Sequence, residues 1–416
     1  MFFSSLFARY AQTPVQQALL ISAALGLFLE ATTGFGIGIV IAAPLYLAMG
    51  FEPSKAAILS LLTQSAVPWG ALAVGTVLNA ELSNVSLKAL GVGSALFTIP
   101  LYLIYTIAVV CIAGGWRTVW RNALTILFLW ASLSVSTWAA NAYVSPPLAG
   151  VLAGFVTASL LLIYFRITSL RINPTIKQTA AAKEDNADLP LWKSVLPYGF
   201  LIVFSLAANL WPPLYRWLHT VLVWRVPSLQ FQLELLYSPG FALLMASIVG
   251  IVMYRLSWAQ IRDCALRTLK QVYPAAISTV GFVAMSTVMQ QARMTDSFSH
   301  NLALWVGSGF LLVSPIIGGL GGLITGSNSA SNAMFAPLQS MMAHELHQSP
   351  LLYAVTQNVA ASNLTMESPS RIALAASITD LAGREGTLTR RTVPLGILAI
   401  VIITICAVGI NIIYYH

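Results

Sequence analysis

The sequence predicts an all-α, polytopic transmembrane protein, from its composition, the length of its apolar runs and the polar breaks within them. Of its 416 residues, 57% are hydrophobic and 8% are charged, and the mean hydropathy is +0.79. A water-soluble domain carries about 25% charged residues, so this chain fits a lipid environment. Its apolar runs are about 18–25 residues long without alternation, which is typical of membrane helices rather than barrel strands. Helices also satisfy their own backbone hydrogen bonds in lipid.

A polar stretch divides the chain into two membrane halves. We expect residues 1–165 to form the first half, residues 166–193 a cytoplasmic linker and residues 194–416 the second half. The mixed stretch 215–236 is more typical of an interfacial segment than of a span. The expected spans lie near residues 16–31, 33–49, 55–80, 87–113, 119–142, 146–165, 195–214, 237–254, 272–292, 300–317, 323–342, 351–379 and 393–413.

The distribution of cations predicts the orientation in the membrane. The net charge is +8, and the Lys and Arg residues lie between apolar spans, which favours membrane orientation over nucleic-acid binding. With the 166–193 linker in the cytoplasm, Arg117, Arg121 and the cluster at 384–391 fall on the same side. The loop at Glu81 then falls outside. The agreement between separate loops supports this count of spans.

A repeat relates the two halves. Residues 43–45 (APL) recur at 336–338, and the same offset of 293 residues relates Thr63-Gln64 to Thr356-Gln357. The orientation count gives the two copies opposite directions, and inverted repeats with broken spans are typical of secondary transporters. Two similar but unrelated helical hairpins are the alternative.

Each copy contains two breaks rich in glycine or short polar residues. The first breaks are residues 32–36 (TTGFG) and 325–332 (TGSNSASN), and the second lie within 63–70 and 356–369. Thr33 or Gly34, and Ser327 or Asn328, are expected to begin half-helices, and Ser368 followed by Pro369 fits an N-cap and the first helical position. Helix N-termini that point into one cavity bind anions. The breaks therefore predict a site for a small carboxylate at the bilayer midplane.

Three ionisable residues are expected within the membrane: Glu30, Glu367 and Arg371. A charge at the bilayer centre costs about 2.5–3.5 kcal/mol on insertion scales, so such groups pair or face a cavity. Arg371 either pairs with Glu367 or binds the substrate carboxylate. Glu30 and Glu367 are the candidate carriers of a coupling proton.

The expected site combines the breaks with these charges. Gly318 to Gly322 are expected to allow close helix packing, while Asn358 and Asn363 are softer candidates for the site. We expect no metal site, because His344 and His347 lack a third ligand, and no cofactor. The residues expected to bind substrate are Thr33, Gly34, Gly36, Gln64, Ser327, Asn328, Asn332, Gln357, Ser368 and Arg371.

At these residues the chain resembles the L-lactate permease family of bacterial secondary transporters. The matching stretches include residues 28–36 (FLEATTGFG) and 325–335 (TGSNSASNAMF), with further matches at 115–117, 211–213 and 381–385. The resemblance implies proton symport of lactate, glycolate or a related 2-hydroxymonocarboxylate across the bacterial inner membrane. It differs at Gln64-Ser65, where the family has Asn-Thr, and at Ile37-Gly38, where the family has Ala-Pro.

Other functions remain open at this point. One alternative is a transporter of a dicarboxylate or another organic anion, with proton or Na⁺ coupling. Counterflow with unlabelled competitors would distinguish it from a monocarboxylate transporter. A membrane-embedded enzyme lacks support, because the chain has no nucleophile elbow, paired metal-ligand motif or P-loop. A channel would not show saturable exchange. The expected partners are the carboxylate, a proton and the lipid bilayer but no nucleic acid, and the chain is either a monomer or a homodimer.

Overall fold

The protein is built almost entirely of helices in the computed structural model. The residues described are 11, 13–34, 36–169, 196–197, 199–201, 203–204, 207–208, 211–226 and 231–415. The described residues within Phe3–Ala180 and Ser278–His416 form one compact unit, and those within Ala181–Ile277 form another. Six of the described helices are long and apolar enough to cross a membrane, which confirms the predicted all-α polytopic class. Most of the predicted linker, from residue 170 to 193, lies outside the described residues.

The larger unit begins with a broken hairpin and a second broken span. Helix α3 ends at Thr33 and helix α4 begins at Ile37, so the break predicted at 32–36 is confirmed. A 3-10 segment, Leu62–Trp69, interrupts the next span between α5 and α6, also as predicted. The elements in order are α2 (Pro14–Ala18), a π-helical turn (Leu19–Leu25), α3 (Gly26–Thr33), α4 (Ile37–Ala48), α5 (Pro53–Leu61), the 3-10 segment, α6 (Gly70–Leu82), α7 (Leu87–Gly114), α8 (Trp116–Arg121), α9 (Ala123–Ala139), a second π-helical turn (Ala140–Val144) and α10 (Pro146–Ser169).

The C-terminal part of this unit repeats the same order of elements. The elements are α15 (Met294–Val306), a 3-10 turn (Gly307–Gly309), α16 (Phe310–Thr325), α17 (Asn328–Glu345), α18 (Pro350–Leu364), a 3-10 turn (Thr365–Glu367), α19 (Pro369–Ile378) and α20 (Glu385–Tyr415). Residues 356–358 lie inside the continuous helix α18, so the second break is shorter than predicted. The Gln357 and Asn358 side chains bond to neighbouring helices, and Thr356 donates to the Leu352 carbonyl of its own helix. Spans predicted at 300–317 and 323–342 are displaced, because the chain breaks at Gly307–Gly309 and again at Gly326.

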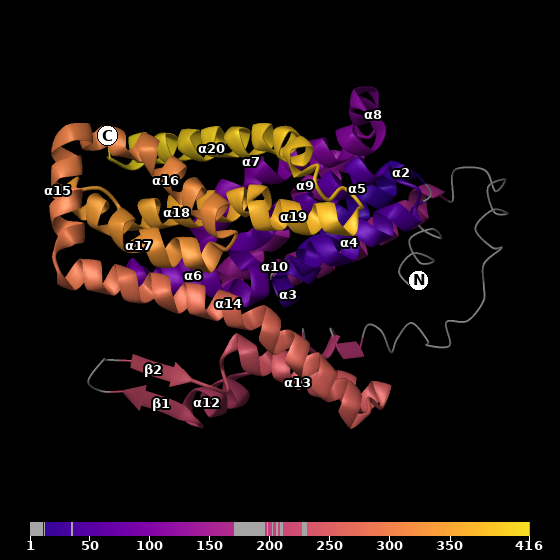
Figure 1. Cartoon of the computed structure of the whole chain (residues 1–416), viewed down its shortest axis with the longest axis horizontal. Helices are drawn as coiled ribbons and strands as arrows, with labels where there is room; N and C mark the ends of the chain where they lie inside the picture. Colours follow the sequence, from indigo (N-terminus) through magenta and orange to yellow (C-terminus); the bar gives the residue numbers. More distant parts are fainter. Residues whose placement is uncertain are drawn as a thin grey trace. The chain divides into compact units, whose positions relative to one another are not determined.

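Helices of the N-terminal and C-terminal parts of the larger unit pack against each other (Figure 1). Helix α6 packs against α17, and α19 packs against α4 and α5. Within the C-terminal part α18 packs against both α16 and α17. Gly322 permits this contact, because a Cβ there would lie 1.9 Å from the Ala361 carbonyl oxygen. This agrees with the packing role predicted for the glycines at 318–322.

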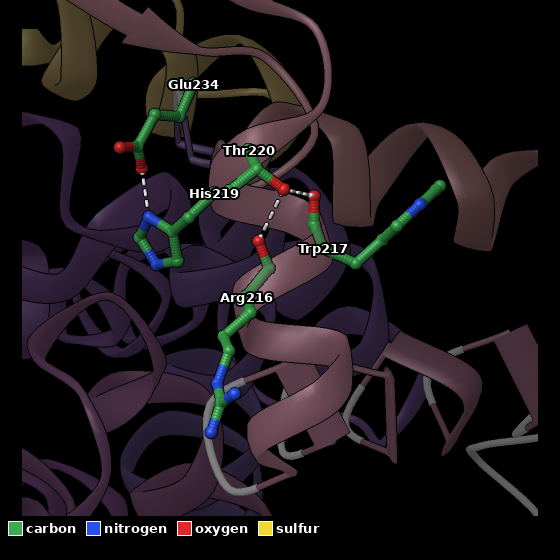
Figure 2. A network of polar contacts seen from close by, with 5 residues as sticks. All are labelled: Arg216, Trp217, His219, Thr220 and Glu234. Atoms are coloured by element: carbon green, nitrogen blue, oxygen red, sulfur yellow. Dashed lines mark hydrogen bonds and ion pairs between the residues drawn. The ribbon is translucent and has the colours of Figure 1, made fainter.

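The smaller unit contains a short helix and a β-hairpin in the stretch predicted to be interfacial. Helix α12 (Pro212–Thr220) precedes β1 (Val223–Val226) and β2 (Phe231–Glu234), which pair antiparallel. His219 Nδ1 contacts the Glu234 carboxylate and so ties α12 to β2 (Figure 2). Thr220 closes the helix by donating to the Arg216 carbonyl, 2.8 Å away. Helix α13 (Pro239–Tyr254) follows, and the chain enters the larger unit within α14 (Trp258–Gln291).

Tyr46 anchors α4 to the first span of the larger unit. Its side chain is fully buried, and its hydroxyl bonds to Ser22 Oγ at 2.6 Å and to the Ala18 carbonyl at 3.1 Å. We expect Tyr46→Phe to destabilise the protein by about 1–3 kcal/mol, because it removes both of these buried hydrogen bonds. The measurement is the melting temperature of the purified protein in detergent.

The matched control for this change is Tyr143→Phe. Tyr143 is 72% exposed, so the loss of its hydroxyl is expected to change stability by less than about 0.5 kcal/mol. Equal melting temperatures for the two variants would contradict the anchoring role of Tyr46.

Candidate functional site

The first break is organised around the buried carboxylate of Glu30. Gly34 and Gly36 have φ angles of 63° and 81°, a left-handed conformation that glycine adopts without strain. This turn carries the start of α4 back toward α3. Glu30 Oε1 accepts from the Gly36 N–H at 3.3 Å, and Oε2 accepts from the Gly38 N–H at 3.4 Å. Glu30 is 2% exposed and lies at the N-terminus of α4. The sequence predicts that the substrate carboxylate binds at this helix terminus.

Gln64 adds a third donor to the same carboxylate. Its Nε2 lies 3.1 Å from Glu30 Oε2, and the side chain reaches there from the 3-10 segment Leu62–Trp69. A carboxylate that accepts several hydrogen bonds is stabilised in its charged form. The interruption between α5 and α6 thus places an amide beside the interruption between α3 and α4.

Arg371 connects the two glycine breaks. Its Nη2 donates to the Gly326 carbonyl at 3.3 Å, and a Cβ on Gly36 would lie 2.0 Å from its Nη1. The breaks at 32–36 and 325–332 therefore lie on either side of one guanidinium. We call Glu30, Gly36, Gln64, Gly326, Ser368 and Arg371 the carboxylate cluster.

Ser368 fixes the base of the Arg371 side chain. It caps α19 by accepting from the Arg371 N–H at 3.3 Å, and its Oγ would lie 2.8 Å from a Cβ on Gly326. Pro369 follows as the first helical residue, as predicted. The cap thus sets the point from which the guanidinium extends toward both breaks.

The cluster brings together one acidic and one basic side chain, Glu30 and Arg371. Both lie at Gly36: Glu30 Oε1 accepts from its N–H, and a Cβ there would lie 2.0 Å from Arg371 Nη1. The two residues are not among the ion pairs found between described residues. Ionisable groups within a membrane typically pair with one another or face a cavity.

A second group of polar side chains lies between α6, α7, α17 and α18. We call it the amide cluster, and its members are all buried: Thr76, Asn79, Ser94, Asn328, Asn332, Gln357 and Asn358. It connects to the carboxylate cluster along the chain, from Gly326 through Ser327 to Asn328. Ser327 caps α17 by accepting from the Ala330 N–H at 3.3 Å, so this half-helix begins as predicted.

Asn358 lies at the centre of the amide cluster. Its Oδ1 accepts from Asn328 and Asn332 at 3.0 Å each. Its Nδ2 donates to Thr76 and Ser94, again at 3.0 Å each. A side-chain amide offers two donors and two acceptor positions, so the hydrogen-bonding capacity of Asn358 is filled. This arrangement is what a structural tie between four helices requires.

Two of the predicted residues point away from the clusters. Thr33 bonds back to the Leu29 carbonyl of its own helix. Glu367, 4% exposed, faces α20, where a Cβ on Gly396 would lie 2.0 Å from its Oε2. The pairing of Glu367 with Arg371 is therefore absent from the described residues. The Glu367 Oε1 atom has no hydrogen-bond partner among them.

Several members of the amide cluster were not among the residues predicted from the sequence. Asn79 was detectable as an amide inside an apolar helix, where such groups bond across to neighbours. Thr76 and Ser94 carried no such signal, because hydroxyls in helices commonly bond their own backbone. Asn358 was a softer candidate, and the structure makes it central.

We expect Asn358→Leu to destabilise the protein by about 3 kcal/mol or more, because it removes four hydrogen bonds to buried polar groups. Asn363→Leu is the matched control on the same helix, where the side chain bonds only to Tyr105 and to the Val359 carbonyl among the described residues. The measurement is the melting temperature in detergent. If Asn363→Leu lowered it as much, Asn358 would not be the central tie.

Known proteins similar to this chain are bacterial permeases. The family model described as L-lactate permease matches residues 5–227 and 218–415. The L-lactate permease of Escherichia coli (strain K12) is 26% identical over 426 residues, covering 92% of this chain and 75% of its own length. That of Bacillus subtilis (strain 168) is 26% identical over 91% of this chain and 75% of its own. Glycolate permease GlcA of Escherichia coli (strain K12) is 24% identical, over 91% and 74% respectively.

These matches cover most of the chain, and they agree with the resemblance found in the sequence motifs. Together with the six membrane-length helices, they confirm the prediction of a bacterial membrane transporter. The chain belongs to the L-lactate permease family.

Proposed function

We propose that the protein imports a small 2-hydroxymonocarboxylate such as lactate or glycolate together with a proton. The names of its relatives support this substrate class. The observation that carries the proposal is the carboxylate cluster, in which Arg371 lies between two broken helices and shares Gly36 as a neighbour with Glu30. The substrate carboxylate binds the guanidinium and the nearby backbone N–H groups at the start of α17.

The amide cluster has a structural role next to this site. The capacity of Asn358 is filled by its neighbours, whereas the carboxylate cluster contains groups that a ligand can engage. In this proposal Asn328, Asn332 and Gln357 hold the start of α17 in place. Gly34 and Ser327 shape the two turns, and Ser368 positions Arg371.

Charge balance provides the coupling to protons. With Glu30 ionised, the cluster holds one negative and one positive charge. A substrate carboxylate beside it would add an uncompensated buried negative charge, which is strongly unfavourable. Protonation of Glu30 removes this obstacle and weakens its hold on the Gly36 and Gly38 N–H groups. One proton and one monocarboxylate then cross together, and the charge of the cluster does not change.

The same argument favours a monocarboxylate over a dicarboxylate. Arg371 is the cationic side chain that the structure places in the cluster among the described residues, and it compensates one carboxylate. A second carboxylate would need another compensating charge or proton. Counterflow with unlabelled succinate as competitor distinguishes the two classes.

The reciprocal packing of the copies supports inverted repeats. Exchanging the copies converts the contact of α6 with α17 into the contact of α19 with α4, and both are observed. Pro44 and Pro337, which the repeat equates, lie inside α4 and α17. We infer that the copies have opposite orientations and that the site is exposed alternately to the two sides.

The test is uptake of labelled L-lactate into proteoliposomes under an imposed pH gradient. We expect the wild-type protein to accumulate lactate and to lose accumulation when the gradient is collapsed. Glu30→Gln, which mimics the protonated side chain, is expected to retain lactate exchange. In this variant the internal lactate concentration should only reach the external one, because the substituted side chain carries no coupling proton.

Glu81→Gln is the matched control, since Glu81 is exposed at the end of α6, and it should accumulate lactate normally. If lactate accumulation follows an imposed Na⁺ gradient and not the pH gradient, the coupling ion is Na⁺ and not the proton. If Glu367→Gln uncouples the protein and Glu30→Gln does not, the proton is carried by Glu367.

A second prediction concerns Gly36. Gly36→Ala would force the Arg371 guanidinium away from the break, so we expect the apparent affinity for lactate to fall about 10- to 100-fold. Gly50→Ala is the control: Gly50 has a similar φ of 84°, but a Cβ there would have no neighbour within 4 Å in the part of the chain that the structure describes. It introduces comparable backbone strain without displacing Arg371. If Gly36→Ala and Gly50→Ala had equal affinities for lactate, Arg371 would have no role in substrate binding.

A further inference from the structure

Gln64 contains an unpaired acceptor beside the proposed site. The side chain is 1% exposed, and its Nε2 donates to Glu30 Oε2 at 3.1 Å and to Thr63 Oγ1 at 3.3 Å. Its Oε1 has no hydrogen-bond partner among the described residues. Buried polar atoms are rarely left without a partner, so an orphan acceptor at this position needs an explanation.

The bond to Glu30 determines which end of the Gln64 amide is orphaned. Nε2 donates to Glu30 Oε2, so the carbonyl oxygen of Gln64 faces elsewhere. A protonated Glu30 keeps a carbonyl oxygen that can accept the same bond, so this orientation is compatible with both protonation states. The packing places the amide beside the first turn of α4, because a Cβ on Gly38 would lie 3.4 Å from Nε2. The orphan oxygen thus belongs to an amide that contacts Glu30, the residue whose other carboxylate oxygen bonds to Gly36.

The chemistry of a 2-hydroxy acid matches this pair of groups. Its hydroxyl is carried by the carbon next to the carboxylate, so it presents a hydrogen-bond donor close to an anionic group. The carboxylate cluster offers a cation and an orphan acceptor that are linked through Glu30 and Gly36. An unsubstituted acid lacks the donor, and a 2-oxo acid presents a second acceptor to the Gln64 oxygen.

We propose that Gln64 Oε1 accepts a hydrogen bond from the 2-hydroxyl of the substrate and so selects 2-hydroxy acids over acids that lack this group. The inference rests on the proposed transport function and assigns Gln64 as a specificity-determining residue. A site built to bond a hydroxyl discriminates against the analogue without it, because the acceptor is then left buried and unpaired. We expect discrimination of about 10- to 100-fold.

The experiment measures how unlabelled acids inhibit uptake of labelled L-lactate by the full chain in proteoliposomes. The pairs are glycolate against acetate and L-lactate against propionate. The wild-type protein should bind the hydroxylated member of each pair about 10- to 100-fold more tightly. Gln64→Met keeps the length of the side chain without the acceptor. It should bring both ratios close to one, mainly by weakening the hydroxylated acids.

Gln339→Met is the matched control. Gln339 is also fully buried with an orphan Oε1, but its Nε2 bonds to the Ser314 carbonyl and Gln357, away from Glu30 and Arg371. Its ratios should equal those of the wild type. Gln64→Asn, which retains an acceptor on a shorter side chain, should preserve part of the preference.

The outcomes separate the inference from the proposed function. Preserved ratios in Gln64→Met, or wild-type ratios near one, would overturn the role of Gln64 while leaving lactate transport intact. Failure of the wild-type protein to take up or bind any of the four acids would overturn the proposed function itself. If Gln64→Met transports too slowly, the shift in melting temperature produced by glycolate and by acetate gives the same ratio on purified protein.

Discussion

The arrangement of the site depends on one buried carboxylate. Glu30 accepts from the Gly36 and Gly38 N–H groups and from Gln64, and Arg371 lies at the same glycine, Gly36. These interactions bring together the end of α3, the start of α4, the 3-10 segment before α6 and the start of α19. Without an acceptor there, the glycine turn would leave N–H groups and a guanidinium uncompensated within the membrane. A charge that is unfavourable alone thus becomes the organising element of four chain segments.

The two clusters differ in charge and in how completely their hydrogen bonds are made. The amide cluster is neutral and buried, with Asn358 joining α6, α7, α17 and α18 through bonds of 3.0 Å. The carboxylate cluster is charged and contains an acceptor that remains unpaired among the described residues. A buried polar network that is fully satisfied rigidifies the structure around it. The amide cluster therefore fixes the start of α17 next to the carboxylate cluster.

Much of the fold was predictable because backbone breaks follow from residue type. Gly34, Gly36, Ser327 and the Ser368-Pro369 pair mark helix ends through conformations and caps that depend on local chemistry. The charged residues of the site were predictable from their rarity in lipid. Their partners were not, because they depend on side chains distant in sequence. Glu30 occupies the helix terminus assigned to substrate, Glu367 turns to Gly396, and the hairpin of β1 and β2 arises where no strand was expected.

The missing side chain at Gly36 also constrains how this chain can change. Any larger residue there would enter the space of the Arg371 guanidinium, and a shorter residue at 371 would lose the bond to the Gly326 carbonyl. Neither position can therefore drift independently of the other, although they come from opposite ends of the chain. Evolution toward a different cargo must proceed through paired replacements or through neighbours that leave this contact intact.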